Sequence, residues 1–311
     1  MNKLSSVSVI IPVHGCLNLI EELNKRLIEN LILISKKYQI IYVDDSDDIE
    51  IWKKLKKICK TSKKIKSIKL SRNFGQHAAI YAGLENSTSD WVIIMDCDLQ
   101  DRPEEIINLV KNCDSNTDII YASRKKRSDN FFKILASKFF YILMSWLTNI
   151  TLDYTVSNFG IYSKKSIEAV LSLKDKHKFF PLMIRWIGFN SKTINVIHDK
   201  RKIGKSSYSL FKLILISLST IISFSDKPLK IFMLIGFLIS FLSACVAFYY
   251  LYLYLNNQIL ILGYSSLIIS IWFIGGILLA ALGFIGIYIG KTFDQTKQRP
   301  VYIISEKINF K

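Results

Sequence analysis

The chain has 311 residues, half of them hydrophobic, which is enough for one sizeable core with residues left over for an additional segment. Its 42 Lys and Arg residues against 25 Asp and Glu residues give a net charge of +17, which suits nucleic acid, an anionic membrane surface or a phosphorylated substrate without choosing among them. The five cysteines form no CxxC pair and have no histidine at metal-ligand spacing, which excludes a zinc-finger type of site and favours a reducing, cytosol-facing location.

Residues 1 to about 200 alternate between short apolar runs and longer mixed stretches, the pattern of alternating strands and helices. The predicted strands are SVSVIIPV, YQIIYVDD, IKSIKLS and DWVIIMD. The predicted helices are residues 17–35, the Lys-rich stretch after Asp48, residues 77–85 and residues 103–112. This order predicts an α/β domain with a largely parallel sheet, in which ligands bind beyond the carboxyl ends of the strands.

Carboxylates follow two of the predicted strands: Asp44 and Asp45 after the second, and Asp96, Asp98 and Asp101 after the fourth. Gathered at one edge of a parallel sheet, such groups repel one another unless a cation or a hydrogen-bonding ligand lies among them. Asp96 and Asp98, with Gln100 two residues further, can turn toward one hard cation. Mg²⁺ and Mn²⁺ prefer oxygen ligands and keep positions open for phosphate oxygens.

Two further stretches are apolar with a few lysines: FFKILASKFFYILMSWL, residues 131–147, and YSLFKLILISLSTIISF, residues 208–224. They are too short or too polar to cross a membrane. We predict amphipathic helices that lie at the membrane surface, with ordinary core helices as the alternative.

Two long segments without a charged residue, 231–255 and 259–289, follow near the C-terminus. At a rise of about 1.5 Å per residue, either one is long enough to cross a hydrocarbon core about 30 Å thick. The short link at residues 256–258 makes them a hairpin. Basic residues flank the hairpin on both sides: Lys227, Lys230, Lys291, Lys297 and Arg299. The positive-inside rule therefore predicts that the bulk of the chain is cytoplasmic.

Four motifs together resemble those of family 2 glycosyltransferases with the GT-A (Rossmann-like) fold: VSVIIPVHG, YVDDSDD, LSRNFGQHAAIYAGL and MDCDLQDRPEEI. With the amphipathic stretches, KRKIGKSSYSLFKL and the hairpin, the whole chain more narrowly resembles the polyprenyl-phosphate glycosyltransferases, relatives of dolichol-phosphate mannose synthase. The expected domains are a cytoplasmic GT-A domain over 1–207 that includes an interfacial helix at about 131–147, an interfacial helix over 208–228, two transmembrane helices over 229–290 and a cytoplasmic tail over 291–311.

The resemblance implies a role for individual residues. The expected ligands of Mg²⁺ or Mn²⁺ are Asp96, Asp98 and Gln100. The expected nucleotide-binding residues are Pro12, Val13, Asp44, Asp45, Arg72, Gly75, Asp96 and Ser206. The expected catalytic residues are Asp98, Arg201 and Tyr208. A loop that would close over the diphosphate and the lipid phosphate matches the pattern R-x-x-G-x-S-x-Y at Arg201, Gly204, Ser206 and Tyr208.

The implied reaction is inverting transfer of one sugar from a nucleotide-diphosphate donor, such as UDP-glucose, to polyprenyl (undecaprenyl) phosphate at the cytoplasmic face of the bacterial inner membrane. The implied partners are the donor, the acceptor and the bilayer, with no nucleic acid and with a homo-oligomer left open. Two alternatives remain: an enzyme that elongates a lipid-linked glycan, and an inactive membrane scaffold. The scaffold is motivated by Ser157 and Asn158 in place of a Gly-Asp pair, and by Ser207 where relatives often have Lys.

The segment LMIRW is similar to the Q-x-x-R-W signature of processive polysaccharide synthases, but Leu182 occupies the Gln position. We therefore predict an ordinary helix that buries Trp186 and exposes Arg185.

Overall fold

The computed structural model describes residues 4–114, 116–124, 142–150, 156–199, 219–256 and 263–310. The chain forms two compact units: Met1–Ser209 together with Arg299–Lys311, and Leu210–Gln298. The predicted strands and the loop at residues 96–104, called the acidic loop below, belong to the first unit.

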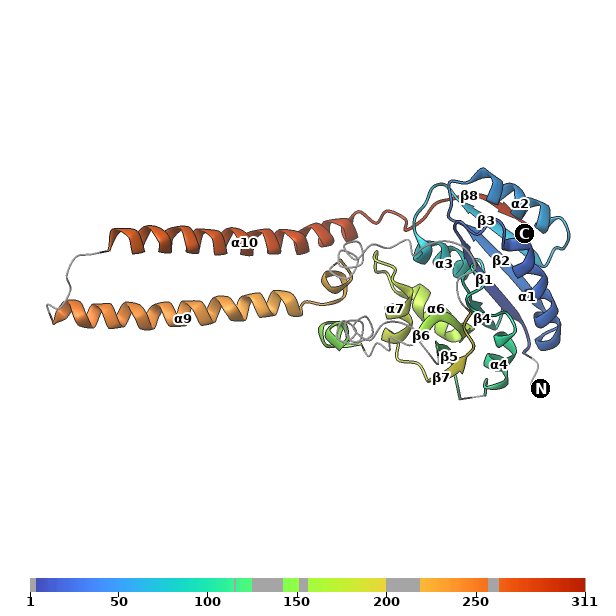
Figure 1. Cartoon of the computed structure of the whole chain (residues 1–311), viewed down its shortest axis with the longest axis horizontal. Helices are drawn as coiled ribbons and strands as arrows, with labels where there is room; N and C mark the ends of the chain where they lie inside the picture. Colours follow the sequence, from blue (N-terminus) through green and yellow to red (C-terminus); the bar gives the residue numbers. More distant parts are fainter. Residues whose placement is uncertain are drawn as a thin grey trace. The chain divides into compact units, whose positions relative to one another are not determined.

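The first unit alternates strands and helices in the predicted order (Figure 1). Its first half contains β1 (Val7–Val13), α1 (Ile20–Ile34), β2 (Tyr38–Asp44), α2 (Ile49–Cys59), β3 (Ile65–Leu70), α3 (Gln76–Glu85), β4 (Trp91–Ile94) and α4 (Glu105–Lys111). Its second half contains β5 (Ile119–Arg124), β6 (Val156–Ser163), α6 (Lys164–Ser172), α7 (Phe180–Trp186), β7 (Ser191–Val196) and β8 (Ile304–Ile308). The expected α/β fold class is confirmed, and so is every predicted strand and helix up to residue 112.

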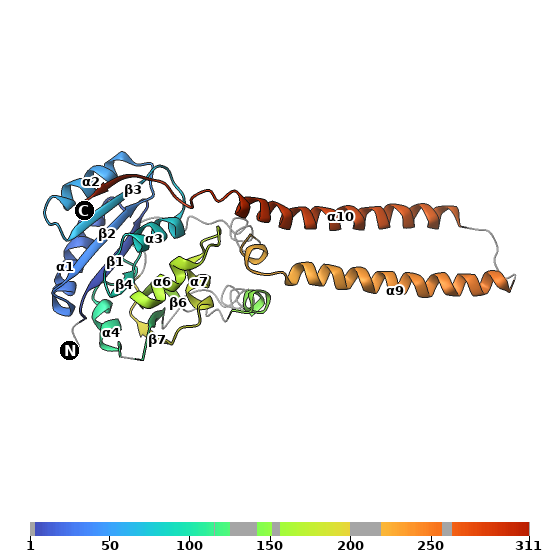
Figure 2. The same ribbon diagram turned by 180° about the vertical axis from the view of Figure 1, so that it is seen from behind.

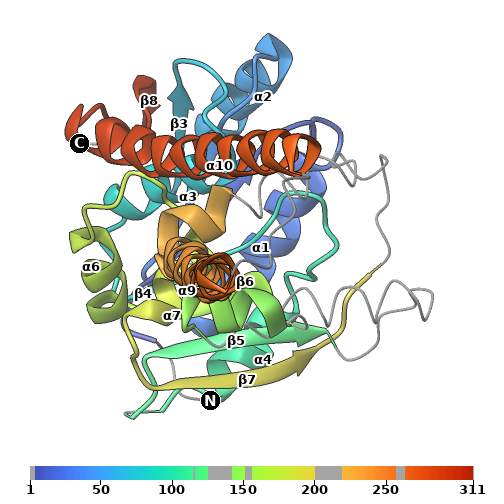
Figure 3. The ribbon, with the colours of Figure 1, turned by 90° about the vertical axis from the view of Figure 1, so that its left-hand side faces the viewer.

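The strands form one sheet in the order β7-β5-β6-β4-β1-β2-β3-β8 within the described residues. Strands β4, β1, β2 and β3 are parallel neighbours, and β5 and β7, side by side in Figure 3, are parallel as well. The sheet is nevertheless mixed, because β6 is antiparallel to β4 and β5, and β8 is antiparallel to β3. The expectation of a largely parallel sheet therefore holds for its centre, where the predicted carboxylates lie.

Strand β1 is buried on both of its faces. Val7, Val9 and Ile11 pack in a cluster with residues of α1, α2 and α4. Ile10 points the other way, toward Gly83 of α3. Figures 1 and 2 show the two helical layers on opposite sides of the sheet. This burial explains why β1 is apolar at every position except Ser8, instead of alternating between apolar and polar residues.

Helix α3 lies so close to β1 that only glycine fits at position 83. A Cβ atom there would lie 2.3 Å from Cγ2 of Ile10, which is fully buried. We expect Gly83→Ala to lower the free energy of unfolding by about 1–3 kcal/mol, despite the higher helix propensity of alanine. The midpoint of thermal unfolding of the purified full chain measures this loss.

The double variant with Ile10→Ala is the matched control for this prediction. The smaller side chain leaves room for the added methyl group, so the double variant should lose less stability than the two single variants together. Strict additivity, or a Gly83→Ala protein as stable as the parent, would contradict the close packing.

The last residues of the chain do not form the separate tail expected for 291–311, because Ile304–Ile308 is strand β8 of the first unit. Figure 2 shows β8 beside β3. Trp52 Nε1 donates a hydrogen bond to Glu306 (2.7 Å), and Asn309 Nδ2 donates to the carbonyl of Ile65 (2.7 Å). The physical reason is that β3 would otherwise be an open edge, which proteins commonly cover.

The described part of the second unit contains two long helices, α9 (Lys227–Leu255) and α10 (Tyr264–Thr296). Both are long and apolar enough to cross a membrane, and their large side chains are exposed, as for Trp272 at 79%. The helices are antiparallel: Phe232 stacks on Phe284 with ring centroids 5.0 Å apart. The predicted hairpin is therefore present as a candidate transmembrane pair. Helix α10 continues past the predicted end at Ile289 to Thr296.

The two predicted interfacial helices are described only at their C-terminal ends. Residues 142–148 and 219–224 are helical, whereas 131–141 and 208–218 lie outside the described residues. In the first of these segments Met144 and Leu147 are buried, while Ile142 and Trp146 are exposed. Residues 142–148 thus have apolar side chains both on their buried side and on their exposed side. Its location at a membrane surface remains a prediction.

Candidate active site

The carboxyl ends of β1, β2 and β4 bring the predicted residues to one edge of the sheet. Val13 is the register partner of Asp44 in the β1–β2 pair, and Ile10 is the partner of Ile94 in the β1–β4 pair. The side chains of Pro12 and Val13 are buried, and the Val13 carbonyl accepts a hydrogen bond from the Asp45 backbone N–H (3.2 Å). These two buried residues form the bottom of the candidate site at this edge of the sheet.

Side chains alternate along the acidic loop that follows β4. Asp96, Asp98 and Gln100 are partly exposed, and the residues between them, Cys97 and Leu99, are buried. Burial thus alternates along these five residues and leaves the three oxygen-bearing side chains partly accessible to a ligand. Leu99 has φ +58°, a left-handed conformation that leucine rarely adopts, and its buried side chain anchors this turn.

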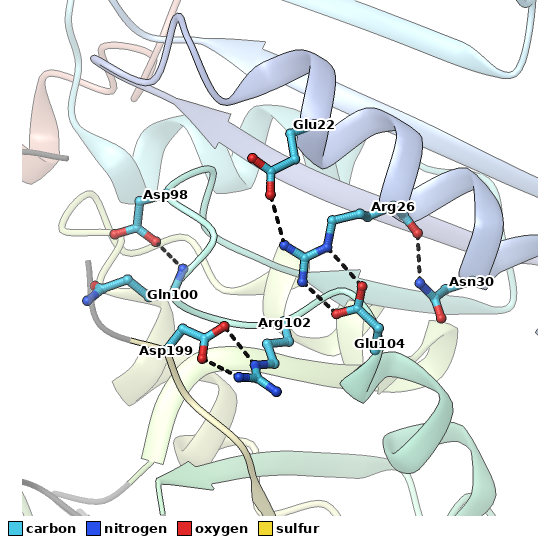
Figure 4. Close-up of polar contacts among 8 residues, drawn as sticks. All are labelled: Glu22, Arg26, Asn30, Asp98, Gln100, Arg102, Glu104 and Asp199. Atoms are coloured by element: carbon cyan, nitrogen blue, oxygen red, sulfur yellow. Dashed lines mark hydrogen bonds and ion pairs between the residues drawn. The ribbon is translucent and has the colours of Figure 1, made fainter. Parts of the chain in front are cut away.

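Neighbouring donors hold the acidic side chains in place. Gln76 Nε2, at the start of α3, donates a hydrogen bond to Asp96 Oδ1 (2.6 Å). The Gln100 backbone N–H donates to Asp98 Oδ1 (3.1 Å), as drawn in Figure 4. Both carboxylates are thus positioned by polar contacts before any ligand binds.

The donor set of the acidic loop fits a hard divalent cation. Two carboxylates and an amide oxygen are the ligand types that Mg²⁺ and Mn²⁺ take in proteins. Among the described residues no three His, Cys, Asp or Glu side chains are grouped so that they could hold a metal ion on their own. A cation held by Asp96, Asp98 and Gln100 would therefore keep positions for water and for the phosphates of a donor, which is how Mg²⁺ usually binds.

Asp44 has a buried oxygen without a hydrogen-bond partner among the described residues. Its Oδ1 accepts hydrogen bonds from the backbone N–H (3.0 Å) and the hydroxyl (2.6 Å) of Ser46, whereas its Oδ2 has no partner. Burial raises the pKa of Asp44, and the Ser46 hydrogen bonds and the charge of Lys69 oppose that rise. Leaving a buried acceptor unpaired costs about 1–3 kcal/mol, so this atom is suited to accept a hydroxyl or N–H of a ligand.

Asp45 has a structural role that no local pattern in the sequence indicates. Its two carboxylate oxygens accept hydrogen bonds from the backbone N–H groups of Phe74 (2.6 Å) and Gly75 (2.8 Å). Burial raises the pKa of Asp45, and these two hydrogen bonds lower it. The carboxylate thus clamps the loop that carries Arg72, whose exposed guanidinium lies 4.6 Å from the centre of the Phe74 ring. Gly75 has φ +97°, which a side chain would strain.

Residues 198 and 199 are bound to the acidic loop. Arg102 Nε donates to Asp199 Oδ2 (2.7 Å), and its Nη2 pairs with Asp199 Oδ1 (Figure 4). The Asp199 backbone N–H donates to the Gln100 carbonyl (2.9 Å), and His198 Nδ1 lies 3.1 Å from Asp101 Oδ1. The segment just before Arg201 is therefore anchored beside the predicted metal ligands. Arg201, Gly204, Ser206, Ser207 and Tyr208 themselves lie outside the described residues.

A second ion pair connects the far end of this loop to α1. Arg26 donates to both oxygens of Glu104 (2.8 and 2.7 Å) and lies 3.3 Å from Glu22 (Figure 4). These hydrogen bonds raise the pKa of Arg26 and lower that of Glu104, so the pair is charged at neutral pH. The segment 98–104 is thus held at both of its ends, which favours a fixed geometry for the acidic loop.

The helix predicted for LMIRW is present as α7 and Leu182 is buried, but the prediction that Trp186 is buried is wrong. Trp186 is 62% exposed, because α7 ends there and Gly188 turns the chain with φ +67°. Arg185 is only partly exposed, with its guanidinium 4.9 Å from the centre of the Tyr121 ring. Trp186, Arg185 and Tyr121 line a cavity of about 490 Å³, together with Asn149 and Ile150.

The comparison with known families decides the class of this protein. The family described as Glycosyl transferase family 2 matches residues 8–171, which run from the second residue of β1 past β4 and the whole acidic loop. The chain belongs to this family. It is a glycosyltransferase, as its motifs indicated.

Curated relatives match the chain over almost its full length. Uncharacterized glycosyltransferase YkcC of Bacillus subtilis is 32% identical over 307 residues, which cover 98% of this chain and 95% of the relative. Prophage bactoprenol glucosyl transferase homolog of Escherichia coli is 30% identical over 303 residues, which cover 96% and 98%. Undecaprenyl-phosphate 4-deoxy-4-formamido-L-arabinose transferase of Proteus mirabilis is 29% identical over 318 residues, which cover 99% and 96%.

A solved structure that the chain matches is the mannosyltransferase PcManGT of Pyrobaculum calidifontis, in complex with GDP-Man and Mn²⁺. It is 15% identical to this glycosyltransferase, covers 97% of this chain and 86% of its own, and superposes with a TM-score of 0.44.

Proposed function

We propose that this glycosyltransferase moves one sugar from a nucleotide-diphosphate donor, a UDP-hexose such as UDP-glucose, to a polyprenyl phosphate such as undecaprenyl phosphate. The observation that carries the proposal is the acidic loop at the same edge of the sheet as the unpaired oxygen of Asp44, in one chain with two helices of membrane-spanning length. The names of the relatives from Escherichia coli and Proteus mirabilis support a lipid-phosphate acceptor.

The donor would bind at the carboxyl edge of the sheet. Asp96, Asp98 and Gln100 would hold Mg²⁺ or Mn²⁺, which supplies positive charge for the diphosphate leaving group. The unpaired Oδ2 of Asp44 would accept a hydroxyl or N–H of the nucleoside, and Arg72 would lie over it from the loop that Asp45 clamps. Ser206 would contact the phosphates in the loop that begins at Arg201.

The chemistry needs no general base on the protein. A phosphate monoester is anionic at neutral pH, so its oxygen can attack the anomeric carbon directly. The new bond joins the lipid phosphate oxygen to that carbon, the bond to the diphosphate oxygen breaks, and the anomeric centre inverts. Arg201 and Tyr208 would stabilise the two phosphate groups during this exchange, and the anchoring of Asp199 beside Gln100 supports their approach to the donor.

One observation favours a second candidate, an enzyme that elongates a lipid-linked glycan. Trp186 stands exposed at the cavity of about 490 Å³, and an exposed aromatic ring beside a cavity is suited to stack on a sugar. The buried Leu182 in place of the Gln of the polysaccharide-synthase signature weighs against this candidate.

The product of the reaction separates the two candidates. We expect incubation with undecaprenyl phosphate, Mg²⁺ or Mn²⁺ and a labelled UDP-hexose to give a lipid with one sugar on one phosphate. UDP should be released in equal amount, because one leaving group departs for each sugar transferred. Chromatography of the lipid extract and mass spectrometry measure both products. A ladder of longer products, or a requirement for a preformed lipid-linked sugar, would instead support the elongating enzyme.

The membrane placement follows from the basic flanks of the hairpin. We propose a multi-pass protein of the bacterial cytoplasmic membrane whose first unit is cytoplasmic, where nucleotide sugars are made. In a Cys245→Ser background, Asn257→Cys should be labelled by an impermeant thiol reagent added to intact cells. Lys25→Cys, on the exposed side of α1, should react only after the cells are opened. The reverse labelling pattern would overturn this placement.

A further inference from the structure

Two cysteines from distant parts of the sequence meet inside the candidate donor site. Cys16 and Cys97 form a disulfide in the structure, with Cα atoms 6.1 Å apart and a sequence separation of 81. Cys16 lies in the loop after β1, and Cys97 lies between Asp96 and Asp98. Their spacing in the sequence gives no sign of the pair, so the sequence analysis did not predict it.

The pair differs from the other cysteines of the chain in its surroundings. Cys59 and Cys113 are buried, and Cys245 is exposed on α9, and all three are free. Cys16 and Cys97 are 8% and 5% exposed, at the ends of two strands that are parallel neighbours. Both cysteines thus keep a small exposed fraction at the edge of the sheet that carries the proposed metal ligands.

The bond joins two loops that have different tasks in the site. The loop after β1 follows Pro12 and Val13, the floor of the proposed nucleotide pocket. The acidic loop carries the proposed metal ligands on both sides of Cys97. Because Cys97 is the chain neighbour of both Asp96 and Asp98, fixing its side chain restricts the backbone positions from which the two carboxylates start. A crosslink at this position limits how the two carboxylates can converge on a cation.

We propose that Cys16 and Cys97 are a reversible oxidation site, which is a dithiol in the reducing cytosol and becomes a disulfide on exposure to hydrogen peroxide. The consequence of oxidation, weaker binding of the donor nucleotide, rests on the proposed function. One thiol is oxidised by the peroxide to a sulfenic acid, with loss of one water molecule. The second thiol then attacks that sulfur, a second water molecule leaves, and the S–S bond forms. A dithiol reductant returns both sulfurs to thiols by exchange.

The first measurement concerns the bond itself and does not depend on the reaction. The purified full chain is reduced, treated with hydrogen peroxide, blocked with an alkylating reagent and digested. We expect mass spectrometry to find the peptides of Cys16 and Cys97 crosslinked after peroxide and separate after dithiothreitol. Alkylation of both residues at the same level before and after peroxide would overturn the proposal.

The second measurement concerns the consequence of the bond. Titration with UDP in the presence of Mn²⁺ should show affinity about tenfold lower for the oxidised chain, a difference of about 1.4 kcal/mol. Dithiothreitol should restore it. The Cys16→Ser variant keeps Cys97 and the acidic loop but cannot form the bond, so its affinity should not respond to peroxide. Cys245→Ser is the matched control and should respond like the parent.

The outcomes separate this proposal from the proposed function. A crosslink with unchanged or higher UDP affinity would overturn the consequence, as would an equal loss of affinity in Cys16→Ser. If the reduced chain binds neither UDP nor GDP, the proposed function is wrong. The crosslink measurement then still decides whether the two cysteines are an oxidation site, because it does not depend on nucleotide binding. The thermal unfolding midpoint of Cys16→Ser, compared with that of the reduced parent, shows whether the variant is folded.

Discussion

Asp98→Asn should lower the turnover of sugar transfer by about 10²–10³-fold, the effect typical of removing one group that stabilises charge in a transition state. The exchange keeps the size of the side chain. It also keeps an oxygen that can accept the hydrogen bond now made by the Gln100 backbone N–H. Asp98 is partly exposed, so the variant removes a negative charge without opening a cavity in the core. The loss should therefore appear in activity and not in stability.

Transfer of a labelled sugar, measured against Mg²⁺ or Mn²⁺ concentration, tests this prediction. The variant should need more metal for half-maximal rate, because one anionic ligand of the proposed cation is missing. Glu29→Gln on α1 is the matched control, since it also removes one carboxylate charge, at an exposed position of the same unit. Its activity and unfolding midpoint should equal those of the parent. Near-normal turnover of Asp98→Asn in EDTA would refute the assignment of a metal to this loop.

Much of the central architecture could be predicted because it depends on local patterns. Strand β1 is buried on both faces and is therefore apolar at every position except Ser8, a pattern that indicates a buried strand without any knowledge of its partners. The convergence of Asp44 with Asp96 and Asp98 follows from one rule, that parallel strands end at the same edge. The rule needed only the order of strands and helices along the chain.

The features that could not be predicted are contacts between residues distant in the sequence. The role of Asp45 in nucleotide binding stays a prediction, whereas its hydrogen bonds to two backbone N–H groups of the next loop have no local signal in the sequence. The pair of Arg102 with Asp199 has no local signal, because charged residues at such separations occur throughout a basic chain. The same holds for Cys16 with Cys97. The exposure of Trp186 depends on the residue at which α7 ends, and the end of a helix is harder to predict from the sequence than its middle.

Strand β8 shows why a short segment after a long apolar one is easily missed. Residues 299–311 are few and partly charged, which is also the composition of a tail. Their fold depends on an acceptor, the open edge of β3, that is formed more than two hundred residues earlier in the chain. Ile304, Tyr302 and Phe310 then pack on a cluster that contains Ile41 and Ile68. Such pairing is visible only once the sheet order is known.

Truncation of the chain after Gln298 should therefore destabilise the first unit, although it removes none of the proposed site residues. The deletion exposes the edge of β3, removes the apolar contacts of Tyr302, Ile304 and Phe310, and leaves Trp52 Nε1 without its partner Glu306. Loss of about 5 kcal/mol is expected from two or three half-buried apolar side chains and the lost hydrogen bonds. For a unit of this size, that loss lowers the unfolding midpoint by about 10–20 °C.

Thermal unfolding of the truncated and full chains in the same detergent measures this difference. Glu306→Gln is the matched control, because it keeps β8 and an oxygen that can accept the Trp52 hydrogen bond, and removes the surface ion pair with Lys56, which is worth at most about 1 kcal/mol. The truncated chain should also aggregate more readily on warming, since a bare strand edge can pair with another copy. A truncated chain that unfolds at the parental temperature would contradict this prediction. It would show that β3 is stable as an edge strand and that β8 contributes nothing to the stability of the sheet.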